Sequence, residues 1–303
     1  MTNETDKPLL TIVIANYNYG RFIESAICSV LRQCEKPIRD KSGRVVLPIT
    51  GGNGSSVELI VCDAASKDNS VEVIQKYSDY LAWWCSEKDG GQSEAFNKGF
   101  NHGCGEWLTW LNADDVYYPG TLLAFARKTN SNPDAQWITG NTMNFVDATK
   151  KVAFVTWGPH YCVKFLKRNH AQMYPFGPTS FWKRSLYERL GGIDESLEYT
   201  MDLEYWARLT MAGVLQTRLN HICWVFRVHE EAKSTGKRRE LKLGAVEEKY
   251  WTKKTGYYYE NSFRNPWYWV WIILRVFDLS MFVRFYRRFS MIGRPVGKFV
   301  DGV

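Results

Sequence analysis

Residues 10–112 alternate between short runs typical of buried strands and longer runs with helical spacing, and this alternation constrains the fold more than any other feature. The continuous β-branched run at Leu10–Ala15 is typical of a strand buried on both faces of a sheet, and Val57–Cys62 predicts a second buried strand. Helical spacing follows each of them, at Arg21–Gln33 and at Asp68–Tyr80. The alternation predicts an α/β fold, with a mostly parallel sheet and helices on both of its faces.

Further elements follow along the chain. Strands are predicted at Leu81–Cys85, Glu106–Leu111, Ala135–Thr139, 214–219 and 222–229, and helices at Gln92–His102, Pro119–Thr129, Lys183–Leu190 and Met201–Met211. Residues 36–56 contain two prolines and several glycines, so they predict an inserted surface loop. We expect one α/β domain over residues 1–230 and a helical C-terminal region over residues 231–303.

The composition excludes several classes of protein. Hydrophobic residues make up 45% of the 303 and charged residues 23%, which excludes a disordered or fibrous chain. The net charge is +7, of which +5 lies in residues 261–303, so the remaining surface is nearly neutral. This distribution argues against a nucleic-acid-binding surface. The thirteen Trp residues fit sugar-stacking sites, interfaces and membrane boundaries, but they also fill cores.

The basic C-terminal region has an amphipathic pattern. At 100° per residue, one face gathers Leu279, Phe282, Phe285, Tyr286 and Phe289, and the opposite face gathers Arg284, Arg287 and Arg288. An aromatic face opposite a basic face is typical of a helix that lies in a membrane interface. The alternative is a helix that completes the core or a homodimer interface.

The location follows from three observations. The most apolar stretch, 267–283, contains Arg275 and Asp278, which makes it a poor transmembrane span. The first ten residues lack the basic and apolar regions of a signal peptide. The seven scattered cysteines show no metal-ligand spacing and indicate a reducing compartment. We therefore expect a cytoplasmic protein, peripheral on the inner face of the cell membrane.

Polar and acidic side chains follow each predicted strand of the first half, where the apolar pattern stops. These segments are Asn16–Asn18, Asp63–Asp68, Ser86–Ser93 and Asn112–Asp115. Ligands of open α/β sheets bind at the carboxyl ends of the strands, and the missing GxGxxG argues against a dinucleotide. Adjacent carboxylates there suit Mg²⁺ or Mn²⁺ together with substrate phosphates. A turn or helix cap is the simpler interpretation of Asp114 and Asp115 alone, but the three other polar strand ends, two of them acidic, favour the metal.

Six segments, in order, resemble family 2 inverting glycosyltransferases of the GT-A fold, of the kind that builds bacterial surface polysaccharides. They are LTIVIANYN (10–18), IVCDAASKDNS (60–70), SEKDGGQSEAFNKG (86–99), WLTWLNADDVYYPG (107–120), GPTSFWKRSLYERLGGIDESLEYTMDLEYWARL (177–209) and FRVH (226–229). The resemblance implies that a sugar moves from a nucleotide-sugar donor to a hydroxyl of a glycan or of a polyprenyl-diphosphate-linked acceptor. UDP is the expected nucleotide, with dTDP and GDP as alternatives.

The resemblance also implies roles for donor-binding residues. Tyr17, beside Asn16, would stack on the nucleotide base, and Asp63 would hydrogen-bond it. Asp89 and Gln92 match the segment that lines the nucleoside and sugar side of the pocket.

The metal ligands and the catalytic base follow from the same resemblance. Asp114 and Asp115 match the residues that hold Mn²⁺ or Mg²⁺ against the diphosphate, and His229 matches a contact of the metal or diphosphate. The family motif often begins with Asp where this chain has Asn112, so the direct ligand stays open between the two carboxylates. We expect both to be solvent-accessible.

Asp202 matches the catalytic base that deprotonates the acceptor hydroxyl, as general-base catalysis requires. The preceding residue, often Glu in relatives, is Met201 here. Local chemistry alone does not distinguish Asp202 from Glu195, Glu198 or Glu204.

Two other functions fit part of the pattern. A metal-dependent nucleotidyltransferase would share the acidic strand ends, but it should bring a basic phosphate loop, and none lies before residue 32. A non-catalytic membrane-bound nucleotide-binding scaffold would not need Asp63, Asp89, Asp115 and Asp202 together.

Overall fold

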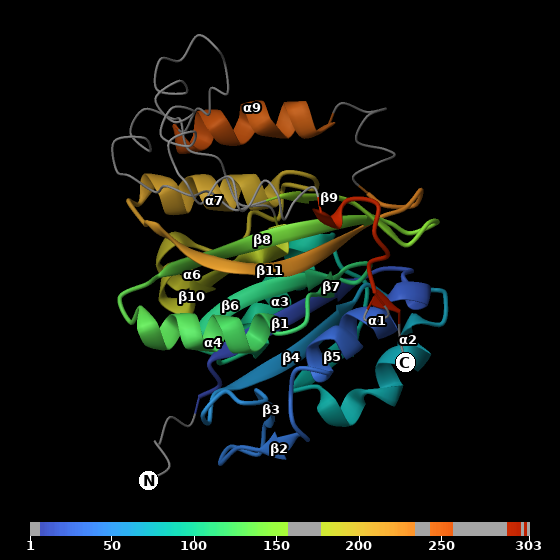
Figure 1. Ribbon diagram of the computed structural model, residues 1–303. Coiled ribbons are helices and arrows are strands. Elements are labelled where there is room, and N and C mark those ends of the chain that lie inside the picture. Colours follow the sequence, from blue (N-terminus) through green and yellow to red (C-terminus); the bar gives the residue numbers. More distant parts are fainter. Residues whose placement is uncertain (1–6, 157–176, 234–242, 257–289, 298–299, 302–303) are drawn as a thin grey trace.

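A computed structural model of the chain describes residues 7–156, 177–233, 243–256, 290–297 and 300–301 (Figure 1). Its centre is an eleven-stranded sheet with the order β2-β3-β4-β1-β6-β10-β8-β11-β7, in which β5 also pairs with β4 and β9 with β8. Helices pack on both faces of this sheet. The predicted α/β class is therefore confirmed.

The central strands are parallel. β1 (Leu10–Asn16) lies between β4 (Ser56–Asp63) and β6 (Trp107–Asn112), and β5 (Trp83–Ser86) pairs with β4. Three of these four strands are buried over nearly their whole length, as continuous apolar runs predict. Their carboxyl ends consequently share one edge of the sheet.

Antiparallel strands extend the sheet beyond β6. β10 (Ser180–Lys183) is antiparallel to β6 and to β8 (Trp137–Val146), while β9 (Lys151–Thr156) is antiparallel to β8. β11 (Gln216–Val228) runs parallel to β8, and β7 (Val116–Tyr117) pairs with β11 in the opposite direction.

The helices divide between two cores. α1 (Gly20–Leu31), α2 (Ser70–Lys76) and α4 (Thr121–Ser131) pack on one face of the sheet. α3 (Gln92–His102), α6 (Arg184–Leu190) and α7 (Met201–Met211) pack on the other. The described residues also include two short helical turns, η1 (Ser78–Tyr80) and η2 (Gly177–Thr179). Along β1 the alternation places Ile12 and Ile14 in the first core and Val13 in the second.

Much of the tryptophan fills the interior. Trp206 stacks between Trp110 and Trp137, with ring centroids 5.4 and 5.5 Å apart, and Trp182 meets Trp206 edge to face. Trp107 and Trp251 are also fully buried. These six side chains stabilise the cores by burying large aromatic surfaces, so they are not sugar-stacking residues.

Two sequence expectations are wrong in detail. Residues 36–56 are not only a loop, because β2 (Ile38–Arg39) and β3 (Val45–Pro48) extend the sheet beside β4, and Leu47 is fully buried. The two strands predicted at 214–219 and 222–229 are one strand, β11, whose register is irregular between Arg218 and Trp224. This irregular register interrupts the side-chain alternation on which the prediction depended.

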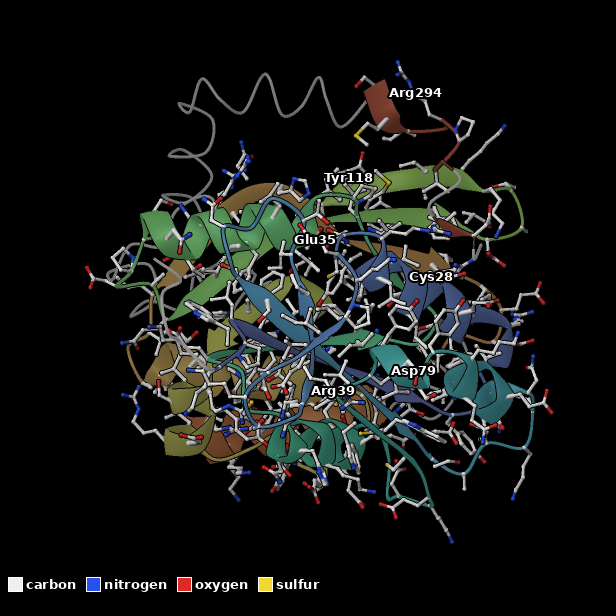
Figure 2. The ribbon with its side chains drawn as sticks, turned by 90° about the horizontal axis from the view of Figure 1, so that it is seen from below. Cys28, Glu35, Arg39, Asp79, Tyr118 and Arg294 are labelled. Carbon is white, nitrogen blue, oxygen red and sulfur yellow. The ribbon has the colours of Figure 1, made fainter. Side chains whose placement is uncertain are left out.

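The described parts of the C-terminal region pack on the main body. α9 (Leu243–Thr255) lies along α7 (Figure 1), and its Trp251 belongs to the second core. Arg294 lies beside the strands drawn in green (Figure 2), and its carbonyl accepts a hydrogen bond from the Val152 amide at 2.9 Å. The predicted amphipathic helix at Leu279–Phe289 falls outside the described residues. Among the described helices, none has the length and hydropathy to span a membrane.

Candidate active site

Strand register aligns four of the predicted polar strand ends. Asn16 at the end of β1 pairs with Asp63 of β4, and Asp63 pairs with Ser86 of β5. On the other side of β1, Ala15 pairs with Asn112 at the end of β6. The first predicted site residues therefore form a row along the carboxyl edge of the sheet, where open α/β folds bind ligands.

Asp63 is the centre of a hydrogen-bonded polar cluster at this edge, formed with Asn16, Ser66 and Ser86 (the Asp63 cluster). It is 1% exposed, and it accepts hydrogen bonds from Asn16 Nδ2 (2.6 Å), Ser86 Oγ (2.6 Å) and the Ser66 amide (3.0 Å). The buried Asn16 Oδ1 has no hydrogen-bond partner within the described residues. A ligand N–H would satisfy this acceptor, since buried polar atoms are normally paired. Tyr17 next to it is 59% exposed.

The turn after Asp63 adopts an unusual backbone conformation. Ala65 has φ +55° and Asn18 has φ +56°, and the two turns are joined because the Lys67 amide donates to Asn18 Oδ1 (2.8 Å). Asn tolerates the left-handed region, whereas Ala pays about 1–2 kcal/mol for it.

The β5–α3 connection brings a second pair of predicted residues to the same edge. Gln92 Nε2 donates to Asn112 Oδ1 at 2.9 Å, so the start of α3 is tied to the end of β6. Asp89 is half-buried and accepts from the Gly91 amide (3.0 Å), and burial raises the pKa of its carboxyl.

The two adjacent carboxylates after β6 have different environments. Asp115 is 1% exposed, and its two oxygens accept from Asn112 Nδ2 (2.8 Å) and from the Arg227 amide (2.9 Å). Burial, reinforced by the charge of Asp114, raises the pKa of Asp115 well above its usual range. The expectation that both carboxylates are solvent-accessible is wrong: Asp115 is directed against the backbone of β11, and Asp114 is only 9% exposed.

Asp114 lies against His229. The β7–β11 pairing brings the end of β11 beside the turn, and His229 Nε2 lies 3.1 Å from Asp114 Oδ2. The imidazole packs on Phe22 (4.7 Å between ring centroids) and meets Tyr19 edge to face. Burial, followed by the charges of Asp114 and Asp115, raises the pKa of the Tyr19 hydroxyl.

Arg227 holds this turn in place, a role that the sequence did not indicate. Its Nε donates to the Asp114 carbonyl (2.8 Å), and its two terminal nitrogens donate to Asp147 (2.6 Å) and to the Val300 carbonyl (2.9 Å). The side chain is 2% exposed, between the Phe22 and Phe145 rings. Arginine offers several donors in a fixed plane, which suits this arrangement of three acceptors.

The donor set at Asp114 fits a divalent cation. Carboxylate and imidazole are both ligands of Mn²⁺-type ions, and Asp114 Oδ2 and His229 Nε2 face each other. The described residues contain no cluster of three His, Cys, Asp or Glu side chains that could hold an ion. Such an ion would therefore take its other ligands from substrate phosphates and water, as Mg²⁺ commonly does.

Asp202 lies in the first turn of α7 and is half-buried. The start of α7 contacts the first turn of α3, where Ser93 Oγ lies within hydrogen-bond distance of the Leu197 carbonyl (2.8 Å) and of Met201 Sδ (2.9 Å). Ser93 follows Gln92, so the residues just before Asp202 lie against the first turn of α3.

The other nearby carboxylates are engaged elsewhere. Glu204 is fully buried and pairs with Arg208, and Glu195 accepts from Asn97 Nδ2 at 2.7 Å. Glu198 is exposed beside Lys233, at 3.8 Å. The sequence alone did not distinguish these carboxylates from Asp202. Their contacts in the structure disfavour Glu195 and Glu204 as bases.

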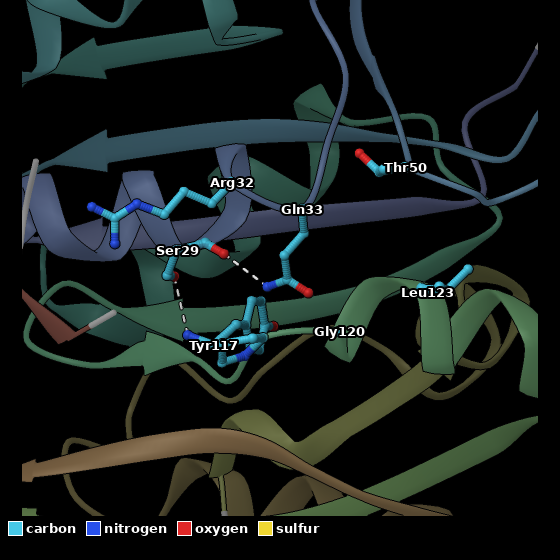
Figure 3. Close-up of a pocket in the computed structure, with 8 residues that line it drawn as sticks. Ser29, Arg32, Gln33, Thr50, Tyr117, Gly120 and Leu123 are labelled. Atoms are coloured by element: carbon cyan, nitrogen blue, oxygen red, sulfur yellow. Dashed lines mark hydrogen bonds between the residues drawn. The ribbon is translucent and has the colours of Figure 1, made fainter. Parts of the chain in front are cut away.

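A separate cavity of about 250 Å³ lies between the end of α1 and the start of α4 (Figure 3). It is at the opposite end of α1 from Asn16–Asn18. Its lining residues are Ser29, Arg32, Gln33, Thr50, Tyr117, Pro119, Gly120 and Leu123. None of them is a carboxylate, so this cavity does not suit a metal-bound diphosphate.

The architecture and the acidic carboxyl edge are those of a GT-A type α/β protein. The sequence profile of Glycosyl transferase family 2 matches residues 11–191, more than half of the chain. The chain therefore belongs to glycosyl transferase family 2. The C-terminal 112 residues lie beyond the match, and they include Asp202 and His229.

Curated relatives and solved structures agree with this assignment. An uncharacterized glycosyltransferase of Rickettsia typhi is 27% identical over 68% of this chain and 60% of its own length. Glycosyltransferase GlyG of Streptococcus pneumoniae is 25% identical over 52% of this chain and 47% of its own length. The chain thus spans less than two thirds of the length of these relatives.

Two solved structures share the fold. Residues 1–349 of S. aureus TarS, in complex with UDP-GlcNAc, match 75% of this chain and 60% of that one, with a TM-score of 0.55 and 13% identity. The mannosyltransferase PcManGT of Pyrobaculum calidifontis, in complex with GDP-Man and Mn²⁺, matches 95% of this chain and 81% of that one, with a TM-score of 0.54 and 15% identity.

Proposed function

We propose that this protein transfers a sugar from a nucleotide-sugar donor to an acceptor hydroxyl by a single inverting displacement. The observation that carries the proposal is that the Asp63 cluster and the Asp114–His229 pair lie along one carboxyl edge. The nucleotide-sugar complexes of the two structural neighbours support it. UDP is the nucleotide that we expect, and a glycan or polyprenyl-diphosphate-linked acceptor fits a role in polysaccharide biosynthesis.

Each region of the site would serve one requirement of the reaction. Asn16, Tyr17 and Asp63 bind the base, and Asp89 and Gln92 line the nucleoside and sugar side. Asp114 with His229 holds Mn²⁺ or Mg²⁺, and a bound cation stabilises the negative charge that develops on the leaving diphosphate. Asp115 supports the turn, and Asp202 removes the proton from the acceptor hydroxyl.

The direct test is turnover of a panel of nucleotide sugars in buffers with and without Mn²⁺. A glycosyltransferase releases nucleoside diphosphate when an acceptor, or water in its place, attacks the sugar. A nucleotidyltransferase would instead release pyrophosphate from a nucleoside triphosphate and a sugar phosphate. A scaffold would bind nucleotide and release neither product.

Tyr17→Ala should weaken nucleoside diphosphate binding without loss of stability. Stacking of a base on an aromatic ring is worth about 1–3 kcal/mol, so the dissociation constant should rise roughly 5- to 150-fold. The side chain is 59% exposed, so its removal leaves no core cavity. Calorimetric titration with UDP, dTDP and GDP measures the change. Tyr80→Ala, at a tyrosine that is 38% exposed, is the matched control. Equal affinities in both variants would contradict the stacking role.

We also propose that the basic C-terminal region binds the inner face of the cell membrane. The support is the net charge of +5 in residues 261–303 and the aromatic pattern at Leu279–Phe289. Each basic residue near an anionic surface contributes about 1 kcal/mol, so replacing Arg284, Arg287 and Arg288 with Gln should weaken vesicle binding about 100-fold.

The vesicle experiment should compare the full-length variant with the wild type. A truncation near Arg264 would be misleading, because Val296 and Val300 are buried in the core around Val116 and Phe145. Cosedimentation with phosphatidylserine vesicles should fall with added salt in the wild type, as screened attraction requires. Unchanged binding of the triple variant would exclude this basic face as the membrane contact.

A further inference from the structure

The segment that leads into α7 is held by a carboxylate from another helix. Glu247 of α9 accepts hydrogen bonds from three successive backbone amides, those of Glu198 (2.7 Å), Tyr199 (2.9 Å) and Thr200 (2.8 Å). Thr200 Oγ1 also donates to it, at 2.8 Å. Both oxygens of Glu247 therefore contact residues 198–200, which precede the candidate base Asp202.

This contact takes the place of an ordinary helix cap. Thr200 is the N-cap residue of α7, but its hydroxyl makes no capping hydrogen bond to the first turn of α7. A capping threonine would normally accept from an amide of that turn. Here the hydroxyl donates outward to Glu247, and the negative charge lies near the N-terminal end of α7, where the helix dipole favours it.

The orientation of α9 does not depend on Glu247 alone. Trp251, one turn further along, is 2% exposed in the second core, and Lys254 pairs with Asp194 and approaches Glu204 at 3.9 Å. These contacts fix α9 against α7, so Glu247 is presented to residues 198–200 from a firmly packed helix. Loss of its charge should release the segment and leave α9 attached.

We propose that Glu247 is a positioning residue for catalysis, which fixes the start of α7 and thereby the carboxylate of Asp202. The inference rests on the proposed role of Asp202 as the base. The Leu203 amide donates to Asp202 Oδ1 at 2.8 Å, so the direction of this carboxylate depends on the backbone of the first turn of α7. Among the described residues, the hydrogen bonds of Glu247 go to residues 198–200 and those of Asn16, Asp63 and Asp114 go elsewhere, so we expect donor binding to be independent of Glu247.

Glu247→Gln is the main variant, because it keeps the size of the side chain and removes its charge and one acceptor. It should lower kcat about 10- to 100-fold, the scale of a misplaced catalytic group. The donor KM and the affinity for UDP with Mn²⁺ should stay at the wild-type value. Glu248→Gln, at the exposed neighbouring residue of α9, is the matched control and should keep wild-type kcat.

Two further variants separate positioning from a general loss of structure. Thr200→Val removes the hydrogen bond that the Thr200 hydroxyl donates to Glu247. It should lower kcat, as Glu247→Gln does. In the Asp202→Asn background, Glu247→Gln should lower kcat little further, because the effects of substitutions at residues that act as a unit are not additive. Thermal melting of each variant shows that the fold is retained.

The outcomes distinguish this inference from the proposed function. Wild-type kcat in both Glu247→Gln and Thr200→Val, or full additivity with Asp202→Asn, overturns the positioning role and leaves the proposed function intact. Equal turnover in the wild type and in Asp202→Asn overturns the base assignment, and the role of Glu247 with it.

Discussion

Asp114→Ala should lower sugar transfer at least about 100-fold, the loss that follows removal of one group that stabilises developing charge. Asp114 faces His229 at the carboxyl edge and keeps 12% of its side-chain surface, so its carboxylate can still reach a ligand. The lower rate would result from the loss of a cation ligand, while the Asp63 cluster would be unchanged. Turnover of the preferred nucleotide sugar across a range of Mn²⁺ concentrations measures the effect.

The contrast with Asp115 makes this prediction specific. Both oxygens of Asp115 accept from N–H donors, so Asp115→Asn must turn an amide NH₂ toward either Asn112 or the Arg227 backbone. A buried mismatch of this kind costs about 1–3 kcal/mol of stability. Asp115→Asn should therefore lower the melting temperature, whereas Asp114→Ala should leave it nearly unchanged. The reverse pattern would contradict the assignment of Asp114 as the direct ligand.

Asp202→Asn should lower transfer by about 10²–10⁴-fold, the usual contribution of a general base. The amide keeps the shape of the side chain and its place in the first turn of α7, but it cannot take a proton at neutral pH. Affinity for UDP with Mn²⁺ should be unchanged, because Asn16, Asp63 and Asp114 are untouched. Steady-state kinetics at saturating donor, with calorimetry on the same sample, separates the two effects.

Glu198→Gln is the matched control for this second prediction. Glu198 is exposed and lies close to α7, and its replacement by Gln removes one carboxylate from the same region. Transfer in this variant should equal that of the wild type. A loss as large as that of Asp202→Asn would move the base to Glu198, and an equal loss of UDP affinity in Asp202→Asn would assign that residue to the donor site.

The sequence predicted the parallel centre of the sheet because its strands carry a strong local signal. β1 and β4 are dominated by apolar and β-branched residues, and α3 was predicted with its observed bounds, Gln92–His102. The antiparallel strands β9 and β10 were missed, since short strands in a mixed sheet depend on partners far away in the chain. Local propensity does not encode such pairing.

In the candidate site, too, features with a local sequence signal were predicted and features that depend on distant partners were missed. The position of each polar strand end along the chain was enough to bring Asn16, Asp63 and Asn112 together, because parallel strands end at one edge. Arg227 and Glu247 were missed because a single Arg in a strand and a single Glu in a charged helix have no distinguishing pattern. Burial of the Asp115 carboxylate was also missed, since it results from tertiary contact with β11.

Binding of a nucleoside diphosphate with a divalent cation is the measurement that tests the central claim most directly. UDP, dTDP and GDP should each be titrated into the wild type and Asp114→Ala by calorimetry, with and without Mn²⁺. The account predicts that Mn²⁺ strengthens binding of one nucleotide to the wild type and that Asp114→Ala removes this gain. Affinities that do not respond to Mn²⁺, or a response that survives in Asp114→Ala, would contradict it.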